Sequence, residues 1–367
     1  MLLLATKVWE QRKLGNLFNE RKEKSTKGEL LSVTLSNGVT KFSDLNKKDN
    51  SNIKSGNYKV VKKNDIPYNS MRMWQGASGV SSYDGIVSPA YTVLVPNRNS
   101  NSNFYAVLFK KKSILNLFTR FSQGLTSDTW NLKYPILKDI IVPFTNLEEQ
   151  KRIFKIFNVI NNLLALYEKK KQLLTQLKQG IVNFLITKNG QKPQLRFSGF
   201  NNNWESKSFE KLLNYEQPTK YIVKKADYIS QGTPVLTANK SFVLGYTNET
   251  NVYQNIPAII FDDFTLESKY VDFPFMVKSS AIKILTSENS NLFFIYQLLN
   301  NQRFVQEGHS RHYISVVQKK KVLVPSIQEQ NKISDLIKQL EDNIELNSNT
   351  IVLLKKLKEF LLQSMFL

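Results

Sequence analysis

The sequence predicts an α+β protein in which two small mixed α/β units alternate along the chain with two long helices, which pair as an antiparallel coiled coil. Three observations predict this fold: an internal pseudo-twofold repeat, two long stretches with helical apolar spacing, and short β-like runs between them. We expect the first unit at 1–147, the first helix at 148–190, the second unit at 191–326 and the second helix at 327–367.

The repeat is the strongest of these observations. A Val-Pro pair followed by Glu-Gln-x-Lys/Arg-Ile occurs at 142–153 and again at 324–333. A Trp-Glu pair opens each half, at Trp9 and at Trp204. Each copy of the motif runs into a stretch without proline, so the expected order is unit, helix, unit, helix.

Each long stretch carries apolar side chains at spacings of three, four or seven. A helix with one apolar stripe of this length is not stable alone in water, so we expect the two stripes to bury each other. The alternative is that each helix packs on its own unit. Asn347 falls on the second stripe, where a polar residue sets register at a cost in stability. The predicted pairing residues are Ile153, Ile160, Leu174, Leu177 and Ile181 in the first helix and Ile333, Leu340, Ile344, Leu354 and Leu361 in the second.

The units combine β-like and helical runs. In the first unit we expect strands at 58–61, 91–95 and 105–109 and a helix at 115–121. In the second unit we expect strands at 233–236, 258–261 and 281–285 and a helix at 292–304. The loops between them are rich in Asn, Ser, Gly and Lys and differ between the two units.

The charge of the chain indicates its partner. A net charge of +21 in 367 residues, with a pI near 9.7, favours a polyanion, because Lys and Arg that neutralise phosphates release counterions. The alternative is a basic protein from an AT-rich genome. No cysteine is present, which is typical of the cytoplasm. No apolar stretch is long enough to span a membrane.

The sequence contains few patterns that are typical of catalytic sites. No phosphate-binding loop and no dinucleotide fingerprint are found. Glu267-x-Lys269, with Asp262 and Asp263 upstream, weakly resembles a metal-dependent nuclease core. His309 and His312 have a spacing that could suit a metal, but no third ligand is near in sequence. We therefore predict a non-enzyme with no catalytic, cofactor or metal site of its own.

The candidate functional site consists of loop residues that can form hydrogen bonds to DNA bases and phosphates. Arg binds guanine edges, Asn and Gln bind adenine edges, and Ser, Thr, Lys and His contact phosphates. The candidates are Asn69, Arg72, Gln75, Ser78, Thr126 and Ser127 in the first unit, and Lys220, Tyr221, Asn239, Lys240, Lys269, His309, Ser310, Arg311, His312 and Tyr313 in the second.

The repeated Val-Pro…Glu-Gln-x-Lys/Arg-Ile motif, each copy leading into a long helix, resembles the specificity subunits of Type I restriction-modification enzymes. The stretches Lys178-Gln179-Gly180 and Leu195 to Trp204 resemble the junction between halves in that family. The resemblance implies two target recognition domains that each read half of a split sequence in double-stranded DNA. The helices would set the spacer between the half-sites and dock the partner subunits.

Those partners would be two methyltransferase subunits, which use S-adenosylmethionine, and restriction subunits, which use ATP and Mg²⁺. The chain itself would bind none of these cofactors. The first unit reaches its Trp-Glu pair at Trp9, whereas the second has the longer lead 195–203. We therefore expect the N-terminal part of the first recognition domain to be either shortened or rearranged. The alternatives are a coiled-coil scaffold with non-specific DNA binding, a nuclease acting through Glu267 and Lys269, and an RNA-binding protein.

Overall fold

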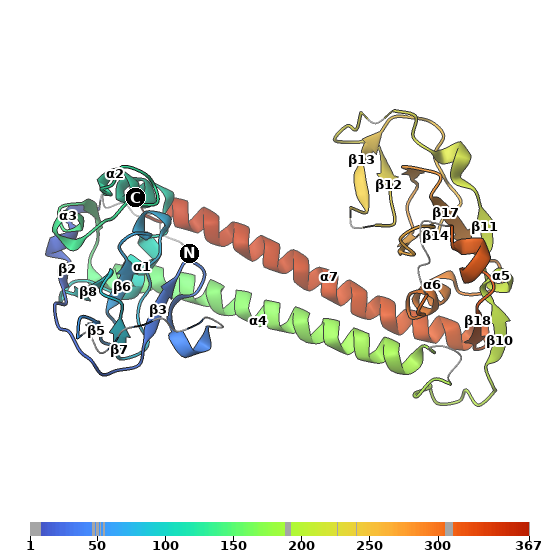
Figure 1. Ribbon diagram of the computed structural model, residues 1–367, viewed down its shortest axis with the longest axis horizontal. Coiled ribbons are helices and arrows are strands. Elements are labelled where there is room, and N and C mark those ends of the chain that lie inside the picture. The colour runs from blue at the N-terminus through green and yellow to red at the C-terminus, as the bar shows by residue number, and fades with distance from the viewer. Residues whose placement is uncertain are drawn as a thin grey trace. The chain divides into compact units, whose positions relative to one another are not determined.

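The computed structural model describes residues 9–45, 48, 51, 53, 56–187, 192–225, 227–239, 241–304 and 311–366 (Figure 1). These residues form two compact units, Met1–Glu168 with Asn349–Leu367, and Lys169–Ser348. Each unit contains one mixed α/β domain and a portion of both long helices, α4 (Leu147–Leu185) and α7 (Ile327–Ser364). No helix among the described residues is long and apolar enough to cross a membrane.

Unit 1 is built from small antiparallel sheets and short helices. β1 pairs with β9, β2 and β6 flank β8, β3 pairs with β4, and β5 pairs with β7. The elements are β1 (Glu10–Lys13), β2 (Phe18–Glu20), β3 (Leu31–Thr34), β4 (Gly38–Lys41), β5 (Lys59–Val61), β6 (Ile66–Asn69), β7 (Gly85–Val87), β8 (Tyr91–Pro96), β9 (Ile141–Phe144), α1 (Ser102–Leu108), α2 (Lys112–Phe121) and α3 (Tyr134–Leu137).

The segment 105–109 was predicted as a strand, and this prediction was wrong because the residues belong to α1 and its C-cap. The side chain of Asn101 accepts a hydrogen bond from Phe104 N at 3.0 Å and caps the helix. Phe104, Tyr105 and Phe109 are then buried in one core, where ring contacts outweigh the β preference of aromatic and β-branched residues. The C-terminal Phe366 packs on Phe104 in the same core.

Unit 2 contains a larger sheet in the order β11-β17-β14-β15, a sheet in the order β13-β12-β16, and the pair β10-β18. α6 packs against β14 and β15. The elements are β10 (Glu205–Ser208), β11 (Asn214–Glu216), β12 (Thr233–Leu236), β13 (Val243–Thr247), β14 (Ala258–Asp262), β15 (Ser268–Val271), β16 (Met276–Val277), β17 (Ile282–Thr286), β18 (Lys321–Val324), α5 (Phe209–Leu212) and α6 (Leu292–Asn300).

The repeated Glu-Gln pair joins each long helix to its domain. The buried Gln150 at the start of α4 accepts a hydrogen bond from Asn101 N at 2.8 Å, and Gln330 at the start of α7 accepts one from Asn291 N at 2.9 Å. Asn101 and Asn291 are the N-caps of α1 and α6. Each glutamine also donates to a main-chain carbonyl just before its own helix. The sequence motif is therefore a structural joint between domain and helix.

The helices pair in the antiparallel sense in both units, as predicted. In unit 1, Ile160 and Leu164 of α4 pack against Ile351 in the second half of α7. The Nζ of Lys355 lies 3.0 Å from Oε1 of Glu168. In unit 2, the end of α4 shares a core with the beginning of α7, and Lys178 binds Glu341. The early half of one helix therefore faces the late half of the other (Figure 1).

One predicted pairing residue is placed wrongly. Leu177 is 51% exposed, and the next residue, Lys178, faces α7 instead. The heptad therefore runs one residue later than predicted at this point. Ile153, Ile160 and Ile333 are buried. The remaining predicted pairing residues are half-buried, namely Leu174, Ile181, Leu340, Ile344, Leu354 and Leu361.

Candidate nucleic-acid interface

In unit 1, most of the first candidates lie on a short loop that follows β6. Asn69 is half-buried and its side chain accepts a hydrogen bond from Met71 N at 3.0 Å, while Arg72 is half-buried and Gln75 is exposed. Lys110 holds the far end of the loop by donating to Gly76 O and to Ser78 O. Burial lowers the pKa of Lys110 to about 8. Ser78 is buried, so the structure corrects its prediction as a surface contact.

The other candidates of unit 1, Thr126 and Ser127, lie on an exposed loop at 124–129. The loop is closed by Thr129, whose hydroxyl accepts from Thr126 N at 3.1 Å and donates to Thr126 O at 2.9 Å. Gly124 has a φ of +145°, and a Cβ there would lie 2.7 Å from Thr129 main-chain atoms, so the turn requires glycine.

These two loops lie side by side. The rings of Trp74 and Trp130 are 5.2 Å apart, and Leu132 N donates to Ser70 O at 2.9 Å. The structure thus brings the 69–75 and 124–129 candidates to one surface, although they are far apart in sequence. Leu125, which is 100% exposed on the second loop, was not among the predicted contacts. An apolar residue within a run of polar turn residues was the available signal.

In unit 2, Lys220 and Asn239 are exposed, whereas Tyr221 and Lys269 are half-buried. The Tyr221 hydroxyl donates to Glu216 Oε1 at 3.2 Å and its ring packs edge-on against Tyr253. Lys269 lies on β15. Tyr221 thus has a structural role, while Lys220 and Asn239 are available at the surface.

The segment 311–313 divides between surface and interior. Arg311 is exposed, but His312 and Tyr313 are buried, which corrects their prediction as surface contacts. The physical reason is that both main-chain N–H groups bond to Asp263: His312 N donates to Asp263 O at 3.2 Å, and Tyr313 N donates to Asp263 Oδ1 at 2.7 Å. The predicted contacts Lys240, His309 and Ser310 lie outside the described residues.

The acidic pair of the nuclease interpretation has a structural role. Asp262 Oδ1 accepts hydrogen bonds from Phe264 N and Thr265 N, both at 2.9 Å. The second carboxylate, of Asp263, faces the buried Lys283 with 3.4 Å between Oδ2 and Nζ. Both carboxylates are thus engaged in holding the local structure, so this geometry does not favour the nuclease interpretation. Within the described residues, no three His, Asp or Glu side chains are grouped as a metal site.

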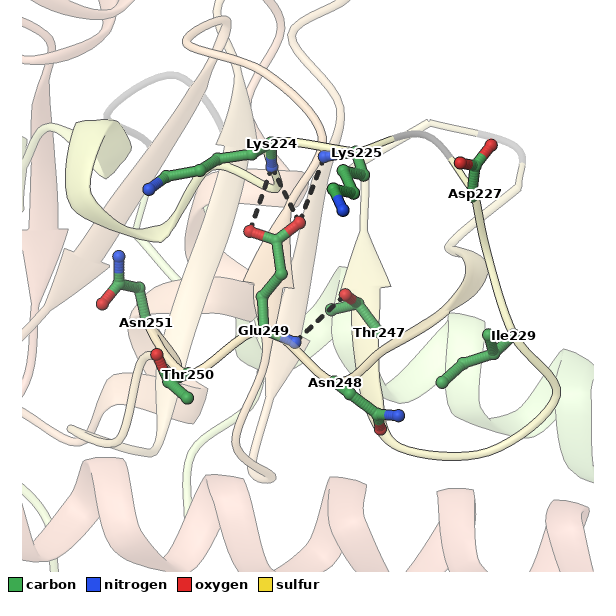
Figure 2. Close-up of a pocket in the computed structure, with 9 residues that line it drawn as sticks. All are labelled: Lys224, Lys225, Asp227, Ile229, Thr247, Asn248, Glu249, Thr250 and Asn251. Carbon is green, nitrogen blue, oxygen red and sulfur yellow. Dashed lines mark hydrogen bonds between the residues drawn. The ribbon is translucent and has the colours of Figure 1, made fainter.

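Unit 2 also contains a cavity of about 460 Å³ beside β13. Figure 2 shows the Glu249 carboxylate inside it, accepting from the main-chain N–H groups of Lys224 at 3.0 Å and Lys225 at 3.1 Å. Successive main-chain N–H groups of this kind hold anions. The carboxylate of Glu249 already occupies that position, so the cavity is a weaker candidate for a DNA phosphate than the exposed loops.

The long helices carry a second apolar stripe that faces solvent. In unit 1, each exposed apolar residue of this stripe directly precedes a residue that faces the other helix, as Val159 precedes Ile160. In an antiparallel helix pair, the twofold axis that exchanges the two helices is perpendicular to the plane that contains both helix axes. Residues at equivalent heptad positions of the two helices therefore lie on the same side of that plane. The exposed stripe, which we call the apolar face, comprises Val159, Leu163, Leu166, Leu353, Leu357 and Phe360, with exposed fractions of 37–66%.

Comparison with known proteins gives consistent results. The family model for the Type I restriction modification DNA specificity domain matches residues 6–176 and 201–356. The specificity subunit of the Type I restriction enzyme EcoR124I/EcoR124II from Escherichia coli is 50% identical over 123 residues, which are 31% of this chain and 30% of that subunit. A putative Type I enzyme MjaX specificity subunit from Methanocaldococcus jannaschii is 23% identical over 297 residues, covering 73% of this chain and 68% of that subunit.

Solved structures agree on the fold. The Type I restriction-modification S subunit from M. genitalium has a TM-score of 0.66 at 16% identity, with coverage of 100% of this chain and 98% of that chain. A chain from a structure of complex assembly and conformational transition in the Type I system has a TM-score of 0.53 at 12% identity, with 96% coverage of both chains. Because the family model covers most of both halves of the sequence, this chain belongs to the Type I restriction modification DNA specificity domain family.

Proposed function

We propose that this chain is the DNA-reading subunit of a Type I restriction-modification complex and recognises a split target in double-stranded DNA. The observation that carries the proposal is the repetition: two α/β domains lead into long helices through the same glutamine joint. We assign residues 1–147 and 191–326 to the two target recognition domains. Their different loops would read different half-sites, and the net charge of +21 supports binding to the phosphate backbone.

In unit 1, the reading surface consists of the adjoining loops at 69–75 and 124–129. Arg72 and Gln75 supply groups that hydrogen-bond to base edges, and Thr126 and Ser127 supply hydroxyls. The closed turn at Gly124 limits the conformational entropy lost when DNA binds. In unit 2, Arg311, Lys220 and Asn239 are the exposed candidates.

The apolar face of the helices is proposed to dock the methyltransferase subunits. Six large apolar side chains on one side of a helix pair form the kind of exposed patch that marks protein interfaces. The apolar face is complementary to an amphipathic helix, which would lie along it. Two methyltransferase subunits, and restriction subunits in addition, are expected in the full complex.

The chain is proposed to be non-catalytic. Methylation with S-adenosylmethionine, and ATP- and Mg²⁺-dependent translocation and cleavage, would belong to the partners. The engagement of Asp262 and Asp263 in structural hydrogen bonds supports this division of labour. We place the complex in the cytoplasm, where it would meet foreign DNA.

The test is a binding selection. The chain is co-expressed with its neighbouring methyltransferase subunit, and DNA enriched from a random pool is sequenced. A split motif with a fixed gap is the expected result. Enrichment without a motif, together with strongly salt-sensitive binding to all DNA, would instead support a scaffold that binds DNA non-specifically.

A further inference from the structure

Unit 2 contains a buried charge pair that holds the segment carrying Arg311. Asp263 and Lys283 have side chains only 2% and 1% exposed, with 3.4 Å between Oδ2 and Nζ. Asp263 follows β14, and Lys283 lies on β17, in the middle of the largest sheet. A lysine inside a strand of buried isoleucines is unusual, because an unpaired ammonium in the interior is costly.

Asp263 also fixes the chain just after Arg311. Through its carbonyl and its Oδ1, Asp263 binds the N–H groups of His312 at 3.2 Å and of Tyr313 at 2.7 Å. Lys283 is held in turn by Gln217 Oε1 at 3.2 Å and by Ser280 O at 3.3 Å. Arg311 is therefore the last exposed residue before the chain enters the interior.

Arg311 directly precedes His312, whose N–H is held by the main chain of Asp263, so the guanidinium of Arg311 is attached close to the Asp263 carboxylate. Burial lowers the pKa of Lys283, Asp263 raises it, and the charge of Arg311 lowers it. A buried carboxylate without a partner strongly attracts any cation within reach. Since Lys283 already neutralises Asp263, the guanidinium of Arg311 is left at the surface.

We propose that Lys283 is a positioning residue for DNA reading: by neutralising Asp263 inside unit 2, it keeps Arg311 exposed and free to donate hydrogen bonds to DNA. The inference rests on the proposed function. The group that accepts from Arg311 is either the edge of a guanine base or a phosphate oxygen. Binding to a guanine edge depends on the DNA sequence, whereas binding to a phosphate does not.

The experiment compares Arg311→Ala, Lys283→Met and the double variant Asp263→Asn/Lys283→Met. Each full chain is purified with its methyltransferase subunits, and its binding is measured to a duplex with the selected target and to a scrambled duplex. We expect Arg311→Ala and Lys283→Met to weaken target binding about tenfold to a hundredfold. The double variant should bind within about threefold of wild type, because the amide oxygen introduced at position 263 still accepts from Tyr313 N while the buried charge is gone.

The pattern across the duplexes identifies the acceptor. A loss on the target duplex alone indicates a guanine edge, and an equal loss on both duplexes indicates a phosphate. The half-site read by unit 1 should keep its preference in every variant, which a general loss of folding would not allow.

Three results would overturn the proposal. Lys283→Met could bind the target duplex like wild type while Arg311→Ala binds it weakly, or the double variant could bind as weakly as Lys283→Met. The third result is wild-type binding by Arg311→Ala. If Lys283→Met does not fold, Lys283→Gln takes its place, because the neutral amide can still donate a hydrogen bond to Asp263 while the charge of the carboxylate stays unneutralised. Wild-type binding by Lys283→Gln would then contradict the proposal. The proposed function is tested separately, by whether the wild-type chain selects a split motif at all.

Discussion

Asn347 lies on the seam between the long helices, and its substitution by leucine should stabilise them. The side chain is only 2% exposed, its Nδ2 donates to Asn343 O, and its Oδ1 has no hydrogen-bond partner among the described residues. A buried acceptor without a partner costs about 1–3 kcal/mol, and the lost Nδ2 bond is worth about 0.5–1.5 kcal/mol. Leucine also buries apolar atoms, so we expect Asn347→Leu to raise the local free energy of opening by about 2 kcal/mol.

The measurement is amide hydrogen exchange across α7 in the full chain, where protection should increase around residue 347. Asn349→Leu is the matched control, because Asn349 is exposed and its change should stay within about 0.5 kcal/mol. Faster exchange in Asn347→Leu, or equal exchange in both variants, would mean that Oδ1 is already satisfied and that the reasoning fails. The same substitution should make the alignment of the two helices less unique, because a buried asparagine in a coiled coil fixes the register at a cost in stability.

Four further predictions concern the reading loops and the helices. Gly124→Ala should weaken DNA binding, measured by titration with the target duplex, while leaving the melting temperature nearly unchanged, because the clash is confined to the exposed turn. The pKa of Lys110 is lowered to about 8, so between pH 8 and 10.5 the unfolded chain binds more protons at this residue and stability rises with pH. The difference in unfolding free energy between wild type and Lys110→Met, measured by denaturation, should therefore grow by on the order of 2–3 kcal/mol over that range. Leu353→Asp on the apolar face should weaken co-purification of the methyltransferase subunits at least about tenfold, as expected when a charge is placed in an interface core. Insertion of seven residues into both α4 and α7 at matched seam positions adds about 10 Å to each helix and should lengthen the DNA spacer by about three base pairs.

Each of these predictions has a result that contradicts it. Unchanged binding by Gly124→Ala would remove the 124–129 loop from the reading surface. If the difference in unfolding free energy between wild type and Lys110→Met does not change with pH, the Lys110 ammonium is solvated. For the apolar face, the control is Val352→Asp, because Val352 is also exposed but lies about 100° around α7 from Leu353; equal loss in both variants would indicate a charge effect. An unchanged spacer after the paired insertion would show that helix length does not set it.

The architecture was predictable because its signals are local and repeated. Val-Pro and Glu-Gln recur before each long apolar stripe, and helical periodicity over many residues leaves few alternatives to a helix pair. The excess of Lys and Arg likewise indicated a polyanion without any knowledge of the fold. The sequence by itself therefore determined the order of units and helices, the antiparallel pairing and the class of partner.

The individual residues of the site were decided by contacts between distant segments. Arg311 is exposed while His312 and Tyr313 are buried because Asp263, about fifty residues earlier, binds their N–H groups. Leu177 faces solvent because Lys178 meets Glu341 on the other helix. Local patterns specify what a segment can form, but which of its side chains reach the surface depends on partners that the tertiary structure alone brings together.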